Sequence, residues 1–148
     1  MNLKRIKEKG GFTLVELMIV VIIVGILAVS AVPIYRANMR RAYSAEGFAT
    51  LGAIRSAQRL YKAEFNTYLA VTAGTGDRAG GIATLLGLDT ADNHYWRNAA
   101  FSVTASGTGD AAVFTATASG VAATGAPGRA RIADITLTMN HAGVTTGP

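Results

Sequence analysis

Glu16 is the residue near the start of the chain whose type and setting indicate specific chemistry. It stands directly before nineteen residues without a charge, Leu17 to Tyr35. An ionised carboxylate at bilayer depth costs about 2.5–3.5 kcal/mol, so it needs a compensating cation. An amine at Phe12, about one helical turn from Glu16, would supply that cation. A shift of one turn between parallel helices brings the amine of one chain to Glu16 of another, which predicts charge pairing between copies rather than catalysis.

The remaining polar residues form no catalytic or metal-binding pattern. The chain has no cysteine, which excludes a disulfide, a thiolate nucleophile and a cysteine-based zinc site. His94 and His141 lack metal-type spacing and are interpreted as loop or turn residues. The run from Asp89 to Asn93 offers three carboxylate or amide side chains, Asp89, Asp92 and Asn93. It is compatible with a weak calcium site, but it lacks the glycine and distal glutamate of a calcium loop and favours a polar turn. We expect no enzyme activity, no cofactor and no metal.

The charge of the chain is concentrated at its N-terminus. The 148 residues are enough for one small domain, and three of the five net positive charges lie in residues 1–11. From Ser44 onward, seven basic residues face seven acidic ones. A neutral body offers no field to hold a phosphate backbone, so we predict no specific nucleic-acid partner and interpret the basic N-terminus as a topology signal.

The uncharged run is about as long as the ~20 residues that a helix needs to cross a bilayer. Because basic residues precede it, the positive-inside rule places the N-terminus in the cytoplasm and the residues after Arg36 outside. The alternative is a cleaved secretory signal, since small residues follow at 28–31. Against it, Glu16 lies where a signal sequence has no use for a carboxylate, and the helical pattern continues beyond this point.

A second helical pattern follows the uncharged run. After Pro33 there is no proline up to Tyr68, and one stripe, interrupted by a glutamine, recurs every three or four positions: Phe48, Leu51, Ile54, Gln58, Tyr61, Phe65 and Tyr68. The stripe predicts an amphipathic helix half that continues the apolar one. From Phe12 to Phe65 this helix would be roughly 80 Å long at 1.5 Å per residue, too long for a small globular domain to enclose.

The C-terminal half is predicted to form a small antiparallel sheet. Residues 69–99 are interpreted as a loop, with a helical turn in the apolar stretch 85–88. Alternation and turn residues predict three strands and a short last one: 100–105, 113–118, 132–139 and 144–146. The predicted fold class is α+β, a long N-terminal helix with a transmembrane first half, packed on a small antiparallel sheet.

The segment Gly10-Gly11-Phe12-Thr13-Leu14-Val15-Glu16 ends a short basic leader and opens the apolar run. It closely resembles the type IV pilin family, whose precursors carry a basic leader ending in glycine, then Phe-Thr-Leu-x-Glu and a hydrophobic stretch. The resemblance is strong over residues 8–65 and architectural beyond them. It implies a type IVa-like major pilin that is cleaved after Gly11 and N-methylated at Phe12, with Phe12 and Glu16 directing filament assembly.

The resemblance also implies partners and a location. Family precursors wait in the bacterial inner membrane as single-pass proteins, where a prepilin peptidase cleaves and methylates them. An ATPase, an inner-membrane platform and an outer-membrane secretin then build a homopolymeric surface filament. On this pattern residues 1–11 are the cytoplasmic leader, 12–35 the transmembrane and filament-core helix half, and 36–148 the exported pilin head. The head would comprise a helix half, a loop and a sheet: 36–68, 69–99 and 100–148.

Gly25 and Pro33 match the two helix-breaking positions of the family. One interpretation is a kink, because glycine and proline are common in membrane helices. The other is local melting, because Pro33 leaves the Val29 carbonyl without its helical partner. Family filaments have an extended segment between these two positions, which implies a fibre that stretches without breaking.

Three juxtamembrane arginines, Arg36, Arg40 and Arg41, follow the span. They are interpreted either as a solvated basic turn at the lipid headgroups or as partners of carboxylates on neighbouring copies, such as Glu46 or Glu64. Sequence does not choose between the two.

Three functions are compatible with these features. The first is a structural subunit of a type IV pilus, serving adhesion, twitching motility or DNA uptake. The second is a pseudopilin of a type II secretion system; major pseudopilins often bind calcium in the last loop, whereas only one acidic residue, Asp134, follows Ile132 here. The third is a soluble exported binding protein released by cleavage near Ala31. The pilus subunit is the preferred prediction.

Overall fold

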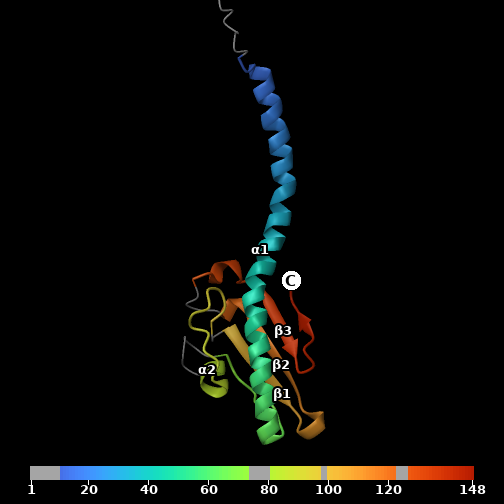
Figure 1. Cartoon of the computed structure of the whole chain (residues 1–148), viewed down its shortest axis with the longest axis vertical. Coiled ribbons are helices and arrows are strands. Elements are labelled where there is room, and N and C mark those ends of the chain that lie inside the picture. Colours follow the sequence, from blue (N-terminus) through green and yellow to red (C-terminus); the bar gives the residue numbers. More distant parts are fainter. Residues whose placement is uncertain (1–10, 74–80, 98–99, 123–126) are drawn as a thin grey trace, which may run out of the picture. The chain divides into compact units, whose positions relative to one another are not determined.

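The structure is a computed structural model, and it describes residues 11–73, 81–97, 100–122 and 127–148. The chain divides into two compact units, residues 1–37 and 38–148, and each is described by itself. A long helix, α1, and a four-stranded antiparallel sheet make up most of the fold, which is α+β and pilin-like as the sequence predicts (Figure 1).

Helix α1 spans Leu14–Phe65, 52 residues, with Pro33 inside it. It begins two residues after Phe12, because Thr13 caps its first turn. It ends three residues before Tyr68, because Asn66 has a φ of 57° and leaves the helical conformation there. Asparagine tolerates this left-handed conformation, which commonly ends a helix.

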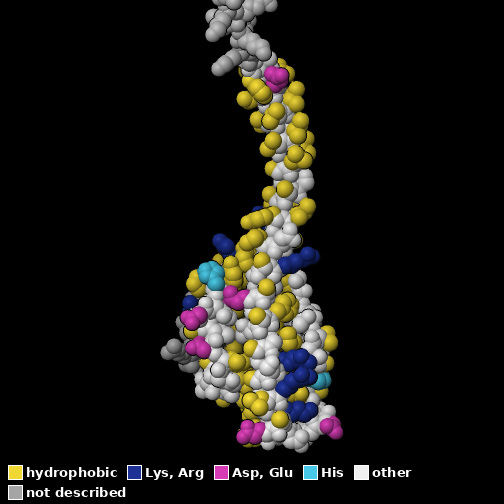
Figure 2. All heavy atoms as spheres, viewed as in Figure 1, with side chains coloured by type: hydrophobic (Ala, Val, Ile, Leu, Met, Phe, Trp, Pro, Cys, Tyr) yellow, Lys and Arg dark blue, Asp and Glu magenta, His cyan; other side chains and the backbone are white. Residues whose placement is uncertain are grey.

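The part of α1 in the first unit is apolar on all sides. Within the described residues, α1 is the one helix long and apolar enough to cross a membrane, judged by length and composition. Its most apolar 18-residue window has a mean hydropathy of 3.0, and none of that window is buried by the chain itself. Hydrophobic side chains cover this part of the helix in Figure 2.

The sheet lies in the second unit, and its strands follow one another in chain order: β1 (Phe101–Ser106), β2 (Val113–Ser119), β3 (Thr136–Asn140) and β4 (Thr145–Thr146). All neighbouring pairs are antiparallel, and the register places Ala116 of β2 between Val103 of β1 and Met139 of β3. These three side chains are buried. They therefore lie on the sheet face that the residues of α1 beyond Asn38 cover (Figure 1).

Two predicted segments differ from the observed ones. A six-residue helix, α2 (Gly81–Leu86), lies inside the stretch interpreted as a loop. Strand β3 begins at Thr136 rather than at residue 132, because the Ile135 N–H donates to the Ile132 carbonyl at 2.8 Å and closes a turn. Ile132 and Ile135 are nevertheless buried, so their hydrophobicity serves the core without belonging to the strand.

The core joins one face of α1 to the sheet. Leu51, Ile54 and Gln58 of the predicted stripe are buried, whereas Phe65 is 54% exposed. The largest fully buried side chains come from several elements: Trp96, Phe101, Phe114, Leu51, Ile54, Ile82, Ile132, Ile135 and Leu137. Burial of each such side chain contributes about 1.5–3 kcal/mol, which makes this cluster the main source of stability of the second unit.

Trp96 fills the centre of this core directly beside α1. Its indole Nε1–H donates to the Tyr43 carbonyl at 2.9 Å, so its polar atom is satisfied. The helix can lie this close because Gly47 has no side chain: a Cβ there would be 2.5 Å from Leu137 Cδ1 and 3.0 Å from Trp96 Cε2. The requirement for glycine at this position is one of space.

Glu46 fixes the chain that leads into Trp96. Its Oε1 accepts the Tyr95 N–H at 2.9 Å and the Trp96 N–H at 2.8 Å, and its Oε2 accepts the His94 N–H at 3.2 Å. Hydrogen bonds to a charged acceptor are roughly twice as strong as neutral ones. One carboxylate on α1 therefore satisfies three successive amides of a segment that has no sheet partner for them.

Two further side chains of α1 hold loops by their backbone. The Gln58 amide pairs with Leu69, accepting its N–H at 2.9 Å and donating to its carbonyl at 2.7 Å. Arg55 donates to the His141 carbonyl at 3.2 Å and to the Ala142 carbonyl at 3.0 Å, in the turn between β3 and β4. Without a cysteine, the C-terminal end is thus held by strand pairing and by an arginine.

We expect Gly47→Ala to lower the free energy of unfolding by about 1–3 kcal/mol, because the new methyl group overpacks the Trp96 contact. The matched control is Gly52→Ala in the same helix, where a Cβ meets nothing within 4 Å. This control should gain about 0.5–1 kcal/mol from reduced backbone entropy. Denaturant unfolding of the full chain in detergent micelles, followed by circular dichroism, measures both. Equal effects of the two substitutions would show that Gly47 is not spatially required.

We expect Glu46→Ala to lower the free energy of unfolding by about 1.5–3 kcal/mol, because three backbone amides lose a charged acceptor. Glu64→Ala, an exposed glutamate of the same helix, should change it by less than about 0.5 kcal/mol. Hydrogen exchange gives a local readout, since the amides of residues 94–96 should exchange faster in the first variant only. Unchanged exchange at these amides would contradict the role of Glu46.

Candidate functional site

The start of α1 is a reciprocal cap formed by Thr13 and Glu16. The Thr13 N–H and hydroxyl donate to Glu16 Oε2 at 3.0 Å and 2.8 Å, and the Glu16 N–H donates to the Thr13 Oγ1 at 3.2 Å. This is the capping box of a Thr-x-x-Glu sequence, in which each residue satisfies the other's free amide. The Thr-x-x-Glu spacing is visible in the sequence. The cap makes Thr13 a partner of Glu16 within the same chain, which the sequence analysis did not predict.

The cap leaves Phe12 outside the helix, with 74% of the residue exposed. Both bonds from Thr13 go to one oxygen of Glu16, at the end of α1 where the unpaired helical amides create positive potential. The site therefore holds an oriented carboxylate next to a freely accessible Phe12. Gly11 is also exposed, and the leader residues 1–10 lie outside the described residues.

The helix that follows this site exposes a continuous apolar surface. Every large hydrophobic residue of the first unit from Leu14 to Tyr35 is about half exposed or more. Exposing such a surface to water costs a free energy of about 25 cal/mol for each Å² of apolar area. It has to be covered by lipid, by other chains or by both in turn.

Gly25 and Pro33 lie within the continuous α1 of this single chain. A Cβ at Gly25 would meet nothing within 4 Å, so no contact inside the chain requires glycine there. Between them, the Ser30 hydroxyl donates to the Ile26 carbonyl at 2.9 Å, a bond that slightly weakens helical geometry. Kinking or melting at these positions stays a prediction.

The three juxtamembrane arginines differ in their surroundings. Arg40 forms an ion pair with Asp134 at 2.6 Å, so it has a partner within its own chain. Arg36 and Arg41 are exposed. Of the two carboxylates expected as intermolecular partners, Glu46 is already bound to three amides, which leaves Glu64.

Arg131 lies beside Tyr43 in the second unit. Its guanidinium is 5.8 Å from the centre of the Tyr43 ring and donates to the Tyr43 hydroxyl at 3.4 Å. This hydrogen bond, and the electrostatic interaction with the same hydroxyl, raise the pKa of Arg131 above its ordinary value. The guanidinium therefore remains charged at any physiological pH.

The histidines and the acidic turn have structural surroundings. The His94 and Tyr95 rings are nearly perpendicular, with their centres 4.6 Å apart, and the His141 carbonyl accepts a hydrogen bond from Arg55. The Ala91 N–H donates to Asp89 Oδ1 at 2.9 Å, which is the polar turn that the sequence favours. In the described part of the chain, no three histidine or acidic residues come together in a way that would hold a metal ion.

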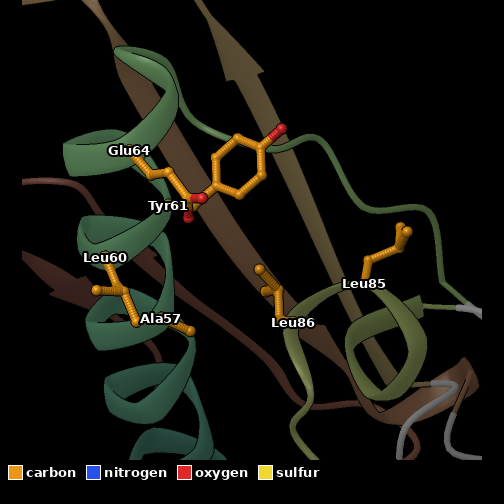
Figure 3. A pocket seen from close by; sticks show the side chains of 6 residues that line it. All are labelled: Ala57, Leu60, Tyr61, Glu64, Leu85 and Leu86. Carbon is orange, nitrogen blue, oxygen red and sulfur yellow. The ribbon is translucent and has the colours of Figure 1, made fainter.

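A shallow pocket between α1 and α2 is a feature that sequence reasoning missed. It has a volume of about 170 Å³ and is lined by Ala57, Leu60, Tyr61, Glu64, Leu85 and Leu86. Figure 3 shows Leu86 projecting toward α1, with the Tyr61 ring and the Glu64 carboxylate above it. The pocket is apolar with one acid, and no spacing in the sequence indicates that residues 57–64 and 85–86 meet.

Comparison with known proteins locates a family motif at the N-terminus. The model of the prokaryotic N-terminal methylation motif, a type IV prepilin motif, matches residues 6–32. This range includes Gly11, Phe12, Glu16 and Gly25, and ends one residue before Pro33.

Several curated proteins are similar to parts of the chain. Fimbrial protein EcpB of Eikenella corrodens is 49% identical over 50 residues, 34% of this chain and 31% of that protein. Type IV major fimbrial protein FimA of Dichelobacter nodosus is 60% identical over 37 residues, 25% of this chain and 23% of that protein. Type II secretion system core protein G of Vibrio cholerae is 35% identical over 66 residues, 45% of each chain. The chain thus spans between about a quarter and a half of the length of these relatives, and no solved structure matches it.

At the level of the family, these relatives are fimbrial and pilin-type subunits rather than enzymes. The N-terminal methylation motif, the fimbrial relatives and the apolar start of α1 agree with one another. The chain carries the type IV prepilin motif at its N-terminus and has a pilin-like fold, and the resemblance to type IV pilins is confirmed.

Proposed function

We propose that this chain is the structural subunit of a type IV pilus, and not an enzyme. The observation that carries the proposal is the exposed apolar half of α1, with Glu16 capped at its start beside Phe12. The precursor is inserted in the bacterial inner membrane with its N-terminus in the cytoplasm. Cleavage after Gly11 and N-methylation at Phe12 then produce the mature subunit, which polymerises into a surface filament.

The ion pair proposed for assembly joins the new Phe12 amine of one subunit to Glu16 of its neighbour. At an effective dielectric constant near 20, such a pair at 4 Å is worth about 4 kcal/mol before desolvation. Thr13 keeps the Glu16 carboxylate pointing back along the chain toward Phe12, so less side-chain entropy is lost when the pair forms. The pair sets the register between subunits, while apolar burial provides most of the stability.

The remaining site residues have roles within this proposal. Gly25 and Pro33 mark the segment that kinks or melts once the helices leave lipid. Arg36, Arg40 and Arg41 lie beyond the span, where arginines favour anionic headgroups before assembly. The partners are other copies of the chain, membrane lipid, a prepilin peptidase and methyltransferase, and a machine with a platform, an ATPase and a secretin. The filament would serve adhesion, motility or DNA uptake.

A pseudopilin of a type II secretion system is the second candidate, favoured by the similarity to protein G of that system. Against it, Asp134, the acidic residue that follows Ile132, is paired with Arg40. A soluble exported binding protein is the third candidate. It would lose the helix start by cleavage near Ala31, although α1 continues through this residue into the second unit.

The mature N-terminus tests the proposal directly. We expect Edman degradation or mass spectrometry of the exported chain to find methylated Phe12 as the first residue. Gly11→Leu should block cleavage and leave the leader in place, because the family's peptidase cuts after glycine. A mature chain that starts near residue 32 would contradict the proposal and support the soluble alternative.

The role of Glu16 is tested by Glu16→Ala. We expect the ratio of sheared filament to total subunit to fall at least about tenfold, which corresponds to a loss of about 1.4 kcal/mol. Asp110→Ala, an exposed carboxylate of the second unit, should leave the ratio unchanged. Immunoblots of sheared and cell fractions give the ratio. Filaments at ordinary abundance in the Glu16 variant would contradict the proposed pairing.

A further inference from the structure

The last turns of α1 carry three cations along one flank. Arg55, Arg59 and Lys62 are spaced by four and three residues, which places them within a sector of about 60° around the helix. We call these three residues the basic flank. Figure 2 shows Lys and Arg side chains gathered over the lower turns of α1.

The opposite flank of the same turns carries the pocket of Figure 3, with an acid at its rim. Its apolar members are unusually accessible for their size, since Leu60 is 73% exposed and Leu85 is 50% exposed. Glu64 lines the same pocket and is also exposed. We call the pocket residues together the acidic pocket: Ala57, Leu60, Tyr61, Glu64, Leu85 and Leu86.

Some of these charges already have partners within the chain. Arg55 is bound to the turn between β3 and β4, and the Lys62 ammonium lies 5.1 Å from the centre of the Tyr68 ring. Arg59 and Glu64 have no ion pair or hydrogen bond within the described residues. They also cannot pair with each other in one chain, because a spacing of five residues turns them about 140° apart.

We propose that the basic flank of one copy docks on the acidic pocket of a second copy, with Arg59 of the first paired to Glu64 of the second. The proposal rests on the pilus function proposed above. The two surfaces are complementary in charge and lie on opposite flanks of α1, so each copy offers one to each side. Such a head-to-tail contact generates an open helical fibre when its rotation does not close into a ring, which is the case that the proposed pilus requires.

The axial register supports this pairing. One screw operation relates all atoms of two neighbouring copies, so every part shifts by the same amount along the fibre. Pairing of the Phe12 amine with Glu16 requires a shift of four residues, about 6 Å along a helix. Arg59 and Glu64 are five residues apart, about 7.5 Å, with the cation again first. Each pair, taken within its own unit, therefore asks for an axial step of similar size and of the same sense along the chain.

Apolar area adds to the ionic contact. Docking would cover the exposed side chains of Leu60 and Leu85, and the methylene stems of Arg59 and Lys62 are suited to lie on them. Covering the pocket also lowers the local dielectric around Glu64, which strengthens its interaction with an arriving guanidinium.

A charge swap in the full-length chain, expressed in its pilus-forming host, tests the pairing. We expect R59E and E64R each to reduce sheared filament, relative to total subunit, by about fivefold or more, since both place like charges in contact. The double variant R59E/E64R should recover to within about twofold of the unaltered chain, because the pair is restored with reversed polarity. D110R is the control for charge reversal at an exposed acid and should have little effect.

The proposal would be overturned if R59E and E64R left the ratio of sheared filament to total subunit unchanged. It would also be overturned if the double variant gave no more filament than the single variants. Chemical cross-linking keeps the test valid if a charge reversal reduces subunit levels. The chain has no cysteine, so R59C/E64C carries the only two thiols. A short bismaleimide should convert its filaments into a ladder of covalent multimers, and R59C or E64C alone should not form one.

The proposed pilus function and the proposed contact between copies are contradicted by different results. If the unaltered chain yields no sheared filament, the pilus function fails. If filaments form at ordinary abundance but R59C/E64C gives no ladder, only the contact between the basic flank and the acidic pocket fails.

Discussion

The fold depends on one physical constraint, the apolar surface of the first half of α1. No residue of the most apolar stretch is covered by the chain itself, so the stable state of this helix requires lipid or other copies. A single ionisable side chain, Glu16, interrupts that surface, and it does so at the helix start where free amides and Thr13 stabilise it. The same position is where a newly formed amine would appear. Storage in lipid and assembly with other copies, as proposed, would therefore be two solutions to one problem of exposed apolar area.

The second half of α1 meets the same constraint within its own unit, and it does so partly with polar side chains. Glu46, Arg55 and Gln58 each bind backbone groups of loops, while Gly47 lets Trp96 pack against the helix. These bonds replace the cross-link that a cysteine-free chain lacks. Among the charged side chains of this half of α1, Arg41, Arg59 and Glu64 have no ion pair or hydrogen bond within the described residues, and Arg59 and Glu64 lie in its last turns.

The sequence was sufficient to predict the elements that follow a simple period. The uncharged run, the stripe at Leu51, Ile54 and Gln58 and the alternating strands predict the α+β fold, because burial on one face repeats with the geometry of the element. It predicted a helical turn at 85–88 but not the start of α2 at Gly81, and it did not predict the three amides on Glu46 or the pocket at Glu64. Those features join residues that lie far apart in the chain, and single-sequence patterns carry no information about such pairs. The Thr13–Glu16 cap, in contrast, depends only on the local spacing Thr-x-x-Glu, which is visible in the sequence.

The charge balance of the residues from 44 onward is consistent with dense packing of copies. A subunit with a large net charge would repel its neighbours at every contact of a fibre, and the repulsion would grow with each copy added. Residues from 44 onward carry equal numbers of basic and acidic side chains, and the proposed cleavage removes three net positive charges with residues 1–11. A neutral body can still carry separate basic and acidic surfaces, which orient neighbours without long-range repulsion. One exposed ion pair is worth little, but a filament repeats it in every subunit, so a weak and well-placed pair is enough to select one register.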